Sequence, residues 1–267
     1  MTARLAFSKN NMSVSVDAIT AQHIGDRKEQ QDRVVILSNP RVPGAALAVL
    51  ADGAGGHKGG AAAAEQVVRT AAQLFREWSP KNETPEFLLR SVISEAHTVI
   101  RLNRALTEEE PHSTVVALLV QPQRVDWAYV GDSRLYHFTG PTLRSRTRDH
   151  SLVELYISQG QWSEAERHNH PQRNLLLQAL GHSEIPEPEF GSAGSLHGGD
   201  AFLLCSDGLW DYFTDAELGK VLDALPPRQA AEALLNAVRQ RANGRGDNVS
   251  IAIVKFTEAK TAYGSSN

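Results

Sequence analysis

The sequence predicts an α+β fold, in which strands are grouped with strands and helices with helices. Two observations carry this prediction. Strand-like segments follow one another in runs along the chain of 267 residues, and helix-like segments come in two pairs. A regular alternation of strand and helix would instead predict a doubly wound parallel sheet. We find no Pro-, Gly- or Ser-rich linker inside the chain, so we expect a single domain.

Three strand-like segments open the expected domain. Residues 12–22 alternate apolar and polar side chains, which is typical of a half-buried strand. Residues 32–38 and 44–52 follow as two further strands, and the turn between them at 39–43 is rich in proline.

The middle and end of the chain carry further strand-like segments. Residues 113–121 and 124–132 are predicted to form a hairpin across a short Gln-Pro-Gln turn. Residues 133–139 are expected to continue this meander until the break at Gly140-Pro141. The last two strands are predicted at 199–207 and 248–256.

Helix-like segments form two pairs. The first segment, 59–78, is rich in alanine, the strongest helix former. In the second, Thr84 is the predicted capping residue, Pro85 the first helical position and Glu86 an acid in the first turn, and the helix then runs through 87–106. The second pair is expected at 215–225 and 227–243.

The remaining segments set the expected domain limits. Residues 147–181 are polar and helical in parts, and we interpret them as a surface flap inserted between strands. Residues 1–12 are expected to be a loose start and 258–267 a polar tail. The single domain is therefore predicted to span 13–257.

Composition and charge exclude several classes of protein. The net charge is −4, so a broad basic face that would neutralise nucleic-acid phosphates is not expected. Cys205 is the only cysteine, which excludes an internal disulfide and a cysteine-based zinc site. The chain shows neither a signal-peptide core nor an apolar run near the ~20 residues of a membrane span. We expect a cytoplasmic monomer.

Five aspartates stand at the ends of predicted strands. Asp52 and Asp207 each end an apolar run and precede a glycine, Asp132 ends another run, and Asp32 and Asp247 open strands. A single Asp-Gly pair is most often only a turn, but its recurrence after two apolar runs weakens that reading. If these strand ends meet on one side of a pair of sheets, the five carboxylates converge.

Convergent carboxylates need cations. Two like charges ~4 Å apart repel by about 4 kcal/mol at an effective dielectric constant of ~20. Oxygen ligands select hard ions such as Mg²⁺ or Mn²⁺, and two such ions ~3.5–4 Å apart can direct a shared hydroxide at phosphorus. Gly53 would allow the backbone to approach the ions closely.

Arg27 precedes Asp32 by five residues and is the candidate phosphate ligand. A planar guanidinium suits bidentate binding of phosphate. The alternative, a solvated arginine in a loop, fits the sequence equally well.

Several segments together resemble, in order, the motifs of the metal-dependent protein phosphatase family, type 2C, also called PPM. The match spans about residues 20–256, and the chain is similar to bacterial stand-alone members of the family. The Gly-(Ser/Thr)-Thr motif of the family resembles His112-Ser113-Thr114. The other matching segments are Arg27 to Arg33, Ala51 to His57, Val130 to Tyr136, Asp149 to Ser151, His170 to Gly181, Ser206 to Asp211 and Asp247 to Ser250.

The resemblance implies a four-layer α-β-β-α sandwich, with two central antiparallel sheets flanked by helix pairs and with a flap subdomain. It implies a protein serine/threonine phosphatase that uses a metal-bridging hydroxide at a binuclear Mn²⁺ or Mg²⁺ centre, with a third ion as in many bacterial members. The implied partners are phosphorylated proteins, namely a bacterial serine/threonine kinase and its substrates. Some similar proteobacterial proteins act in type VI secretion control.

The resemblance also implies a role for each site residue. Asp52 would bridge both metals, Asp207 and Asp247 would complete the first, and the Gly53 carbonyl would complete the second. Asp32 would bind a metal or orient its water. Asp132 would hold the third ion together with Asp207, and Arg27 would bind the substrate phosphate.

Three positions depart from the family pattern. Gln30 stands where asparagine is commonest, and Gln31 where some members carry an acid. Ala54 replaces the histidine that animal members place after Asp-Gly, a proposed general acid. Protonation of the leaving group would then fall to a metal-bound water or to another group. His57 is near in sequence, but a loop histidine at the rim is an equally good interpretation.

Two other functions stay open at this point. One is a catalytically inactive, phosphatase-like module that binds phosphoproteins or a kinase, although the retained aspartates argue against it. The other is a hydrolase of small phosphorylated metabolites, although a polar flap favours protein substrates.

Overall fold

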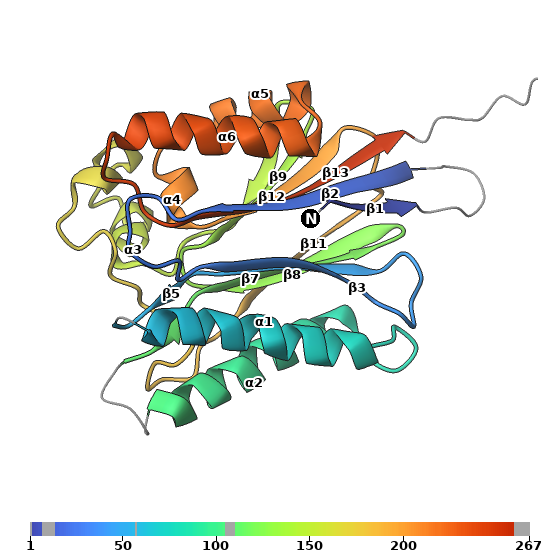
Figure 1. Cartoon of the computed structure of the whole chain (residues 1–267), viewed down its shortest axis with the longest axis horizontal. Coiled ribbons are helices and arrows are strands. Elements are labelled where there is room, and N and C mark those ends of the chain that lie inside the picture. The colour runs from blue at the N-terminus through green and yellow to red at the C-terminus, as the bar shows by residue number, and fades with distance from the viewer. Residues whose placement is uncertain (1, 7–13, 57, 105–109, 259–267) are drawn as a thin grey trace, which may run out of the picture.

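Four layers make up the protein, as a computed structural model shows for residues 2–6, 14–56, 58–104 and 110–258 (Figure 1). A five-stranded and a six-stranded sheet lie face to face, and each carries a helix pair on its outer side. The predicted α-β-β-α sandwich is therefore confirmed. The helix pairs are α1 (Gly59–Glu77) with α2 (Pro85–Arg104), and α5 (Asp215–Ala224) with α6 (Pro227–Ala242).

The five-stranded sheet is antiparallel and is buried on both faces. Along β4, Leu47 and Val49 pack in the cluster beneath α1 and α2, whereas Ala48 and Leu50 pack in the cluster between the sheets. This alternation explains the almost continuous apolar run of the strand. The strands are, in sheet order, β11 (Glu189–Gly194), β8 (Arg124–Val130), β7 (Val115–Gln121), β4 (Ala46–Ala51) and β3 (Arg33–Ser38).

The six-stranded sheet includes a strand within the N-terminal segment that we expected to be a loose start. Thr2–Ala6 forms β1, which pairs with β2 from Thr2↔Ile19 to Ala6↔Ser15. The expectation was wrong because backbone pairing to a free sheet edge needs no strong side-chain pattern. The strands are, in sheet order, β1, β2 (Val14–His23), β13 (Val249–Glu258), β12 (Asp200–Cys205), β9 (Arg134–Thr139) and β10 (Thr142–Arg146).

The connection from β8 to β9 changes sheets. We expected residues 133–139 to continue the meander of β7 and β8, but β9 pairs instead with β12 and β10. Gly131 turns the chain with φ of +105°, and a Cβ at this position would lie 2.7 Å from the Thr114 side chain. Strand patterns do not encode which sheet a strand joins, so the crossing was not predictable from them.

Each helix pair buries one apolar face against its sheet. Ala63, Val67 and Phe75 of α1 and Ile93 of α2 belong to the cluster on the five-stranded sheet. Thr84 caps α2 as predicted, because its Oγ1 accepts a hydrogen bond from the Phe87 N–H at 3.2 Å. On the opposite side, α5 and α6 cover the six-stranded sheet through a separate cluster.

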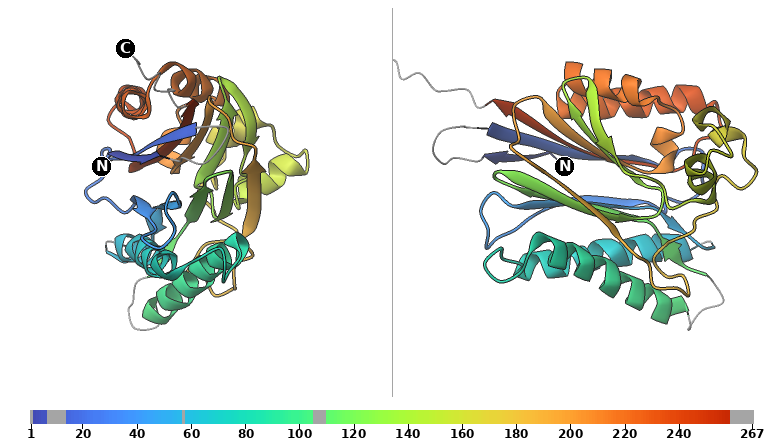
Figure 2. Two further views of the ribbon diagram at one scale, coloured as in Figure 1. Left: turned by 90° about the vertical axis from the view of Figure 1, so that its right-hand side faces the viewer. Right: turned by 180° about the vertical axis from the view of Figure 1, so that it is seen from behind.

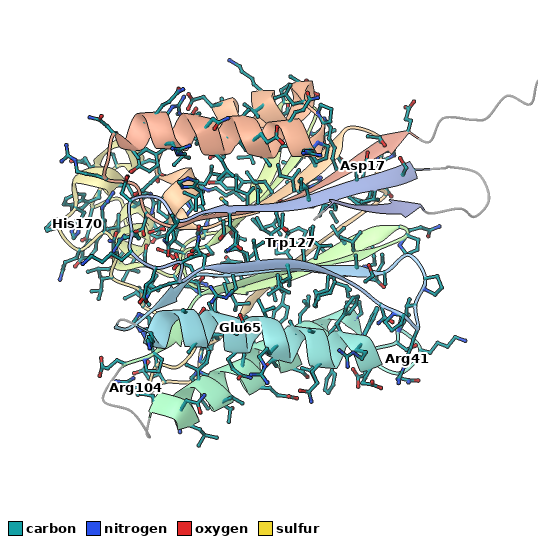
Figure 3. All side chains as sticks on the ribbon, viewed as in Figure 1. Asp17, Arg41, Glu65, Arg104, Trp127 and His170 are labelled. Carbon is teal, nitrogen blue, oxygen red and sulfur yellow. The ribbon has the colours of Figure 1, made fainter. Side chains whose placement is uncertain are left out.

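The flap, which comes between β10 and β11 in the sequence, lies at one end of the sandwich (Figure 2). It contains α3 (Leu152–Ser158) and the 3-10 helix η1 (Glu164–Asn169), and Figure 3 labels His170 within it. Arg134 of β9 and Arg167 of the flap both donate hydrogen bonds to Asp149, and all three side chains are at most 5% exposed. This buried ion cluster ties the flap to the sheet.

Three short elements lie near the same end and had no signal of their own in the sequence. They are β5 (Gly53–Ala54), β6 (His112–Ser113), which pairs with β5, and the one-turn helix α4 (Asp207–Trp210). Within the described ranges, no helix is long and apolar enough to cross a membrane.

Phe202 should be one of the main supports of the inter-sheet core. It is fully buried and its ring contacts those of Trp127, which lies between the sheets (Figure 3), and Phe256. We expect Phe202→Ala to lower the free energy of unfolding by about 3–5 kcal/mol, measured by urea denaturation. Phe87→Ala, at a position 56% exposed, is the matched control and should change it little. Equal effects of the two substitutions would contradict this assignment of the core.

Candidate metal centre

The antiparallel register brings the five predicted aspartates to one end of the sandwich. Asp32 directly precedes β3 and Asp52 directly follows β4, and the pair Arg33↔Ala51 sets these two ends side by side. Asp207 follows β12 and Asp247 precedes β13, which pair up to Cys205↔Ile251. Asp132 lies where the chain crosses from β8 to β9.

A cleft of about 450 Å³ opens at this end. Four of the aspartates line it, whereas Asp32 is only 1% exposed and is not part of the lining. The cleft also contains both Arg27 and Gly53, the two other residues predicted for the site. Its lining further includes Lys28, Glu29, Gln31, Ala54, His112, Thr114, Asn174 and Asn248.

The backbone of Asp52 and Gly53 is held by close neighbours. The Thr114 N–H donates to the Asp52 carbonyl at 2.8 Å, and the Asp52 N–H donates to Thr114 Oγ1 at 3.0 Å. A Cβ on Gly53 would lie 1.9 Å from the Gly60 carbonyl oxygen at the start of α1. Glycine is therefore required here by backbone packing, independently of any metal.

Asp32 lies beneath the cleft and links the two sheets. Its Oδ2 accepts a hydrogen bond from Ser206 Oγ at 2.8 Å, and Ser206 Oγ in turn accepts one from the Ser250 N–H at 3.0 Å. Burial raises the pKa of Asp32 to about 6, although hydrogen bonds from Ser206, Ser250 and Asp52 oppose the shift. Asp32 is thus fixed in position just behind the cleft.

Asp52, Asp132 and Asp207 carry the main electrostatic cost of the site. Burial, followed by repulsion from the neighbouring carboxylates, raises the pKa of Asp52 and of Asp207 well above the ordinary value. Burial raises the pKa of Asp132 to about 7, with repulsion from Asp149 adding to the shift and attraction to Arg134 opposing it. Burial and the neighbouring carboxylates therefore both destabilise the charged forms of these side chains.

Asp247 is the aspartate that has a cationic side-chain partner. Arg27 Nη2 donates to Asp247 Oδ2 at 2.5 Å, and both side chains are more than one third exposed. Asn248 fixes the loop that carries Arg27, because its Nδ2 donates to the Ile24 and Glu29 carbonyls while its Oδ1 accepts from the Gln31 N–H. Arg27 is thus held at the carboxylate cluster from a solvent-exposed loop.

The donor set fits hard divalent cations. In the portions of the chain that the structure describes, no three His, Cys, Asp or Glu side chains are already arranged as a formed metal site. Four aspartates nevertheless line one cleft, and neighbouring carboxylates add to the raised pKa of Asp52 and of Asp207, so positive charge there would relieve the repulsion. Carboxylate and carbonyl oxygens are the ligands that Mg²⁺ and Mn²⁺ prefer.

Three supporting residues were not identified from the sequence as parts of the site. Thr114 fixes the Asp52 backbone, Ser206 holds the Asp32 carboxylate, and Asn248 anchors the Arg27 loop. All three lie inside segments that resemble motifs of the family, which was the available signal. Of the positions that depart from the family pattern, Gln31 donates to the Gly56 carbonyl at 2.9 Å, and His57 lies outside the described residues.

Asp132 is coupled to the flap through Trp210. The Trp210 Nε1–H donates to the Asp132 carbonyl at 3.0 Å, and the Arg134 guanidinium lies 3.6 Å from the centre of the Trp210 ring. Arg134 in turn donates two hydrogen bonds to Asp149, at the entrance to the flap. The position of Asp132 therefore depends on the same buried cluster that holds the flap.

Known proteins resemble this chain in both sequence and fold. Residues 19–246 match the family model described as "Protein phosphatase 2C". The curated protein phosphatase PhpP of Streptococcus pneumoniae is 30% identical over 219 residues, which are 80% of this chain and 87% of PhpP.

Two solved structures are similar over their whole length. PppA of Pseudomonas aeruginosa, described as a key regulatory component of the type VI secretion system, superimposes with a TM-score of 0.74 at 29% identity and covers 90% of this chain and 97% of its own. The catalytic domain of PstP in complex with 2 manganese ions gives a TM-score of 0.78 at 25% identity, with coverage of 92% and 100%.

The carboxylate cluster should make the metal-free protein less stable as the pH rises. The pKa of Asp132 is raised from 3.8 to about 7 in the folded protein, so the cost of its charge is absent below pH 3.8 and complete above about pH 7. In the presence of a chelator, Asp132→Asn should therefore gain stability relative to the unchanged protein as the pH rises from about 4 to about 7. Denaturant unfolding across this range measures the difference, and parallel pH profiles would contradict the prediction.

Proposed function

The chain belongs to the protein phosphatase 2C family of serine/threonine protein phosphatases, and from this premise we propose that it hydrolyses phosphoserine and phosphothreonine at a centre of two divalent cations, Mn²⁺ or Mg²⁺. The observation that carries the proposal is the meeting of four aspartates and Arg27 in one cleft, with Asp32 directly behind it. Manganese is supported by the solved PstP complex with 2 manganese ions.

Each carboxylate has a proposed task in holding the ions. Asp52 would be shared by both, Asp207 and Asp247 would complete the first, and the Gly53 carbonyl would complete the second. Asp32, fixed by Ser206, would orient water at the centre. Repulsion from Asp132 contributes to the raised pKa of Asp207, and these two carboxylates would hold a third ion. When bound, the ions would supply Lewis acidity and the hydroxide that attacks phosphorus.

Arg27 is proposed to bind the substrate phosphate. Its side chain is 60% exposed and already reaches the carboxylate cluster, so a phosphoryl group entering the cleft would meet the guanidinium. If Asp247 holds a cation in place of Arg27, the guanidinium would be free to donate to phosphate oxygens. The bonds from Asn248 to the carrying loop would keep Arg27 in reach during this exchange.

We propose further that the phosphatase opposes a bacterial serine/threonine kinase. The type VI secretion apparatus is the setting to test first, because the similar PppA of Pseudomonas aeruginosa is described as a regulatory component of that system. Proteins phosphorylated by candidate kinases are the substrates to assay.

Activity should depend on a divalent cation and on Asp207. We expect hydrolysis of a phosphothreonine peptide with Mn²⁺ and its loss in excess chelator. Asp207→Asn should lower kcat/KM by more than about 10²-fold, because removal of a ligand costs more than removal of its supporting partner. The exposed Asp223→Asn is the matched control and should retain activity. Hydrolysis that survives the chelator, or near-normal rates in Asp207→Asn, would overturn the proposal.

Substitution of Arg27 should chiefly weaken substrate binding. Arg27→Lys keeps the charge but loses the planar pair of donors, so we expect a roughly tenfold rise in KM for the phosphopeptide. Arg41→Lys, at an exposed arginine paired with Glu77, is the control and should leave the steady-state kinetics unchanged. An unchanged KM in Arg27→Lys would remove Arg27 from the phosphate site.

A further inference from the structure

Hydrolysis of a phosphoserine or phosphothreonine ester leaves an alkoxide, which is strongly basic and needs a proton as it departs. We propose that His112 donates this proton. The proposal rests on the phosphatase function argued above and assigns the one step for which that function has no residue. Ala54 stands where animal members of the family place a histidine proposed as the donor, and it has no ionisable side chain.

His112 is the direct cross-strand neighbour of Ala54. The two-residue strands β5 and β6 pair with the register Gly53↔Ser113 and Ala54↔His112. Opposite residues of an antiparallel pair have their Cβ atoms about 4.5–5.5 Å apart, so they serve the same part of a surface. Consistent with this, both Ala54 and His112 line the cleft that contains Asp52, Asp132 and Asp207.

A backbone carbonyl fixes the ring nitrogen that exchanges the proton. His112 Nδ1 lies 2.9 Å from the Glu110 carbonyl oxygen. A carbonyl oxygen only accepts hydrogen bonds, so Nδ1 carries a hydrogen and Nε2 is left to give up and regain a proton. The same contact restrains the orientation of the ring.

Two glycines clamp the backbone on either side of His112. A Cβ on Gly55, which has φ of +115°, would lie 1.9 Å from the Glu110 carbonyl oxygen. A Cβ on Gly181 of the flap, with φ of +93°, would lie 2.6 Å from the Pro111 carbonyl oxygen and 3.4 Å from His112 Cα. These close approaches hold residues 110–112 between the loop that contains Gly55 and the end of the flap.

Side chains on the outer side support the same placement. The His182 ring lies 5.2 Å from that of His112, centre to centre, and is tilted by 50°. Arg104, at the C-terminal end of α2 (Figure 3), bonds Glu110 Oε1 at 2.6 Å and the Gly181 carbonyl oxygen at 3.4 Å. His112 is therefore half-buried between these contacts and the cleft.

The cationic side chains and the aspartates of the cleft suit the step less well. Arginine and lysine side chains in general give up a proton poorly near neutral pH. Arg27 and Lys28 both lie on an exposed loop. The aspartates are assigned to the cations. Among the lining residues that the structure describes, His112 supplies the one imidazole, the side chain that most often transfers protons in enzymes.

In the proposed step, one bond to phosphorus forms, another breaks and one proton is transferred. As the nucleophilic oxygen forms its bond to phosphorus, the bond between phosphorus and the serine or threonine Oγ breaks, and its electron pair stays on Oγ. The proton on His112 Nε2 moves to Oγ, which gives the free hydroxyl and a neutral imidazole. His112 then regains a proton from solvent before the next turnover.

Leaving-group dependence tests the proposal. p-Nitrophenolate leaves without a proton, whereas a threonine alkoxide does not. His112→Gln should therefore lower kcat for a phosphothreonine peptide by about 10²-fold, while kcat for p-nitrophenyl phosphate with Mn²⁺ changes by less than about threefold. Equal losses on both substrates, or no loss on the peptide, would overturn the role of His112. If the unchanged protein hydrolyses neither substrate with Mn²⁺, the phosphatase function itself fails.

A rescue experiment separates proton donation from a structural role. His112→Gly should show the same selective loss, and adding Ala54→His should restore at least about tenfold of the peptide activity, because the imidazole then enters the same part of the cleft from the paired strand. His197→Gln, at an exposed histidine in the loop before β12, is the control and should behave as the unchanged protein. Failure of the rescue, or a selective peptide loss in His57→Gln with none in His112→Gln, would contradict the assignment.

Discussion

Repulsion among carboxylates at one end of the sandwich is the constraint on which the rest of the site depends. The register of β3 with β4 and of β12 with β13 leaves no choice about where Asp32, Asp52, Asp207 and Asp247 lie. Burial and repulsion from neighbouring carboxylates raise the pKa of Asp52 and of Asp207. The repulsion makes the folded protein less stable, so the arrangement has to serve a function. We propose that this function is the binding of divalent cations.

The surroundings of the aspartates limit how the cluster can relax. Ser206 and Ser250 hold Asp32 from the six-stranded sheet, and Thr114 holds the backbone of Asp52 from the five-stranded sheet. Trp210 connects the Asp132 carbonyl to Arg134 and so to the flap. The cluster is thus built from both sheets at once, and the packing between the sheets fixes the distances across it.

Much of the fold was predictable from the chain. Helix limits and most strands followed from periodicity and capping, as at Thr84, and the aspartates were visible as polar ends of apolar runs. The change of sheet after Gly131, the pairing of β1 and the two-residue strands β5 and β6 were not, because each depends on contacts between distant segments. His112 illustrates the consequence, since only the pairing Ala54↔His112 brings it to the site.

Calorimetric titration of the chelator-treated protein with Mn²⁺ tests the central claim most directly. The account predicts binding of at least two ions for each chain at neutral pH, together with release of protons from the carboxylates, and loss of this binding in Asp52→Asn. Absence of binding by the unchanged protein, or binding of unchanged stoichiometry in Asp52→Asn, would contradict the proposal that these carboxylates are gathered to hold cations.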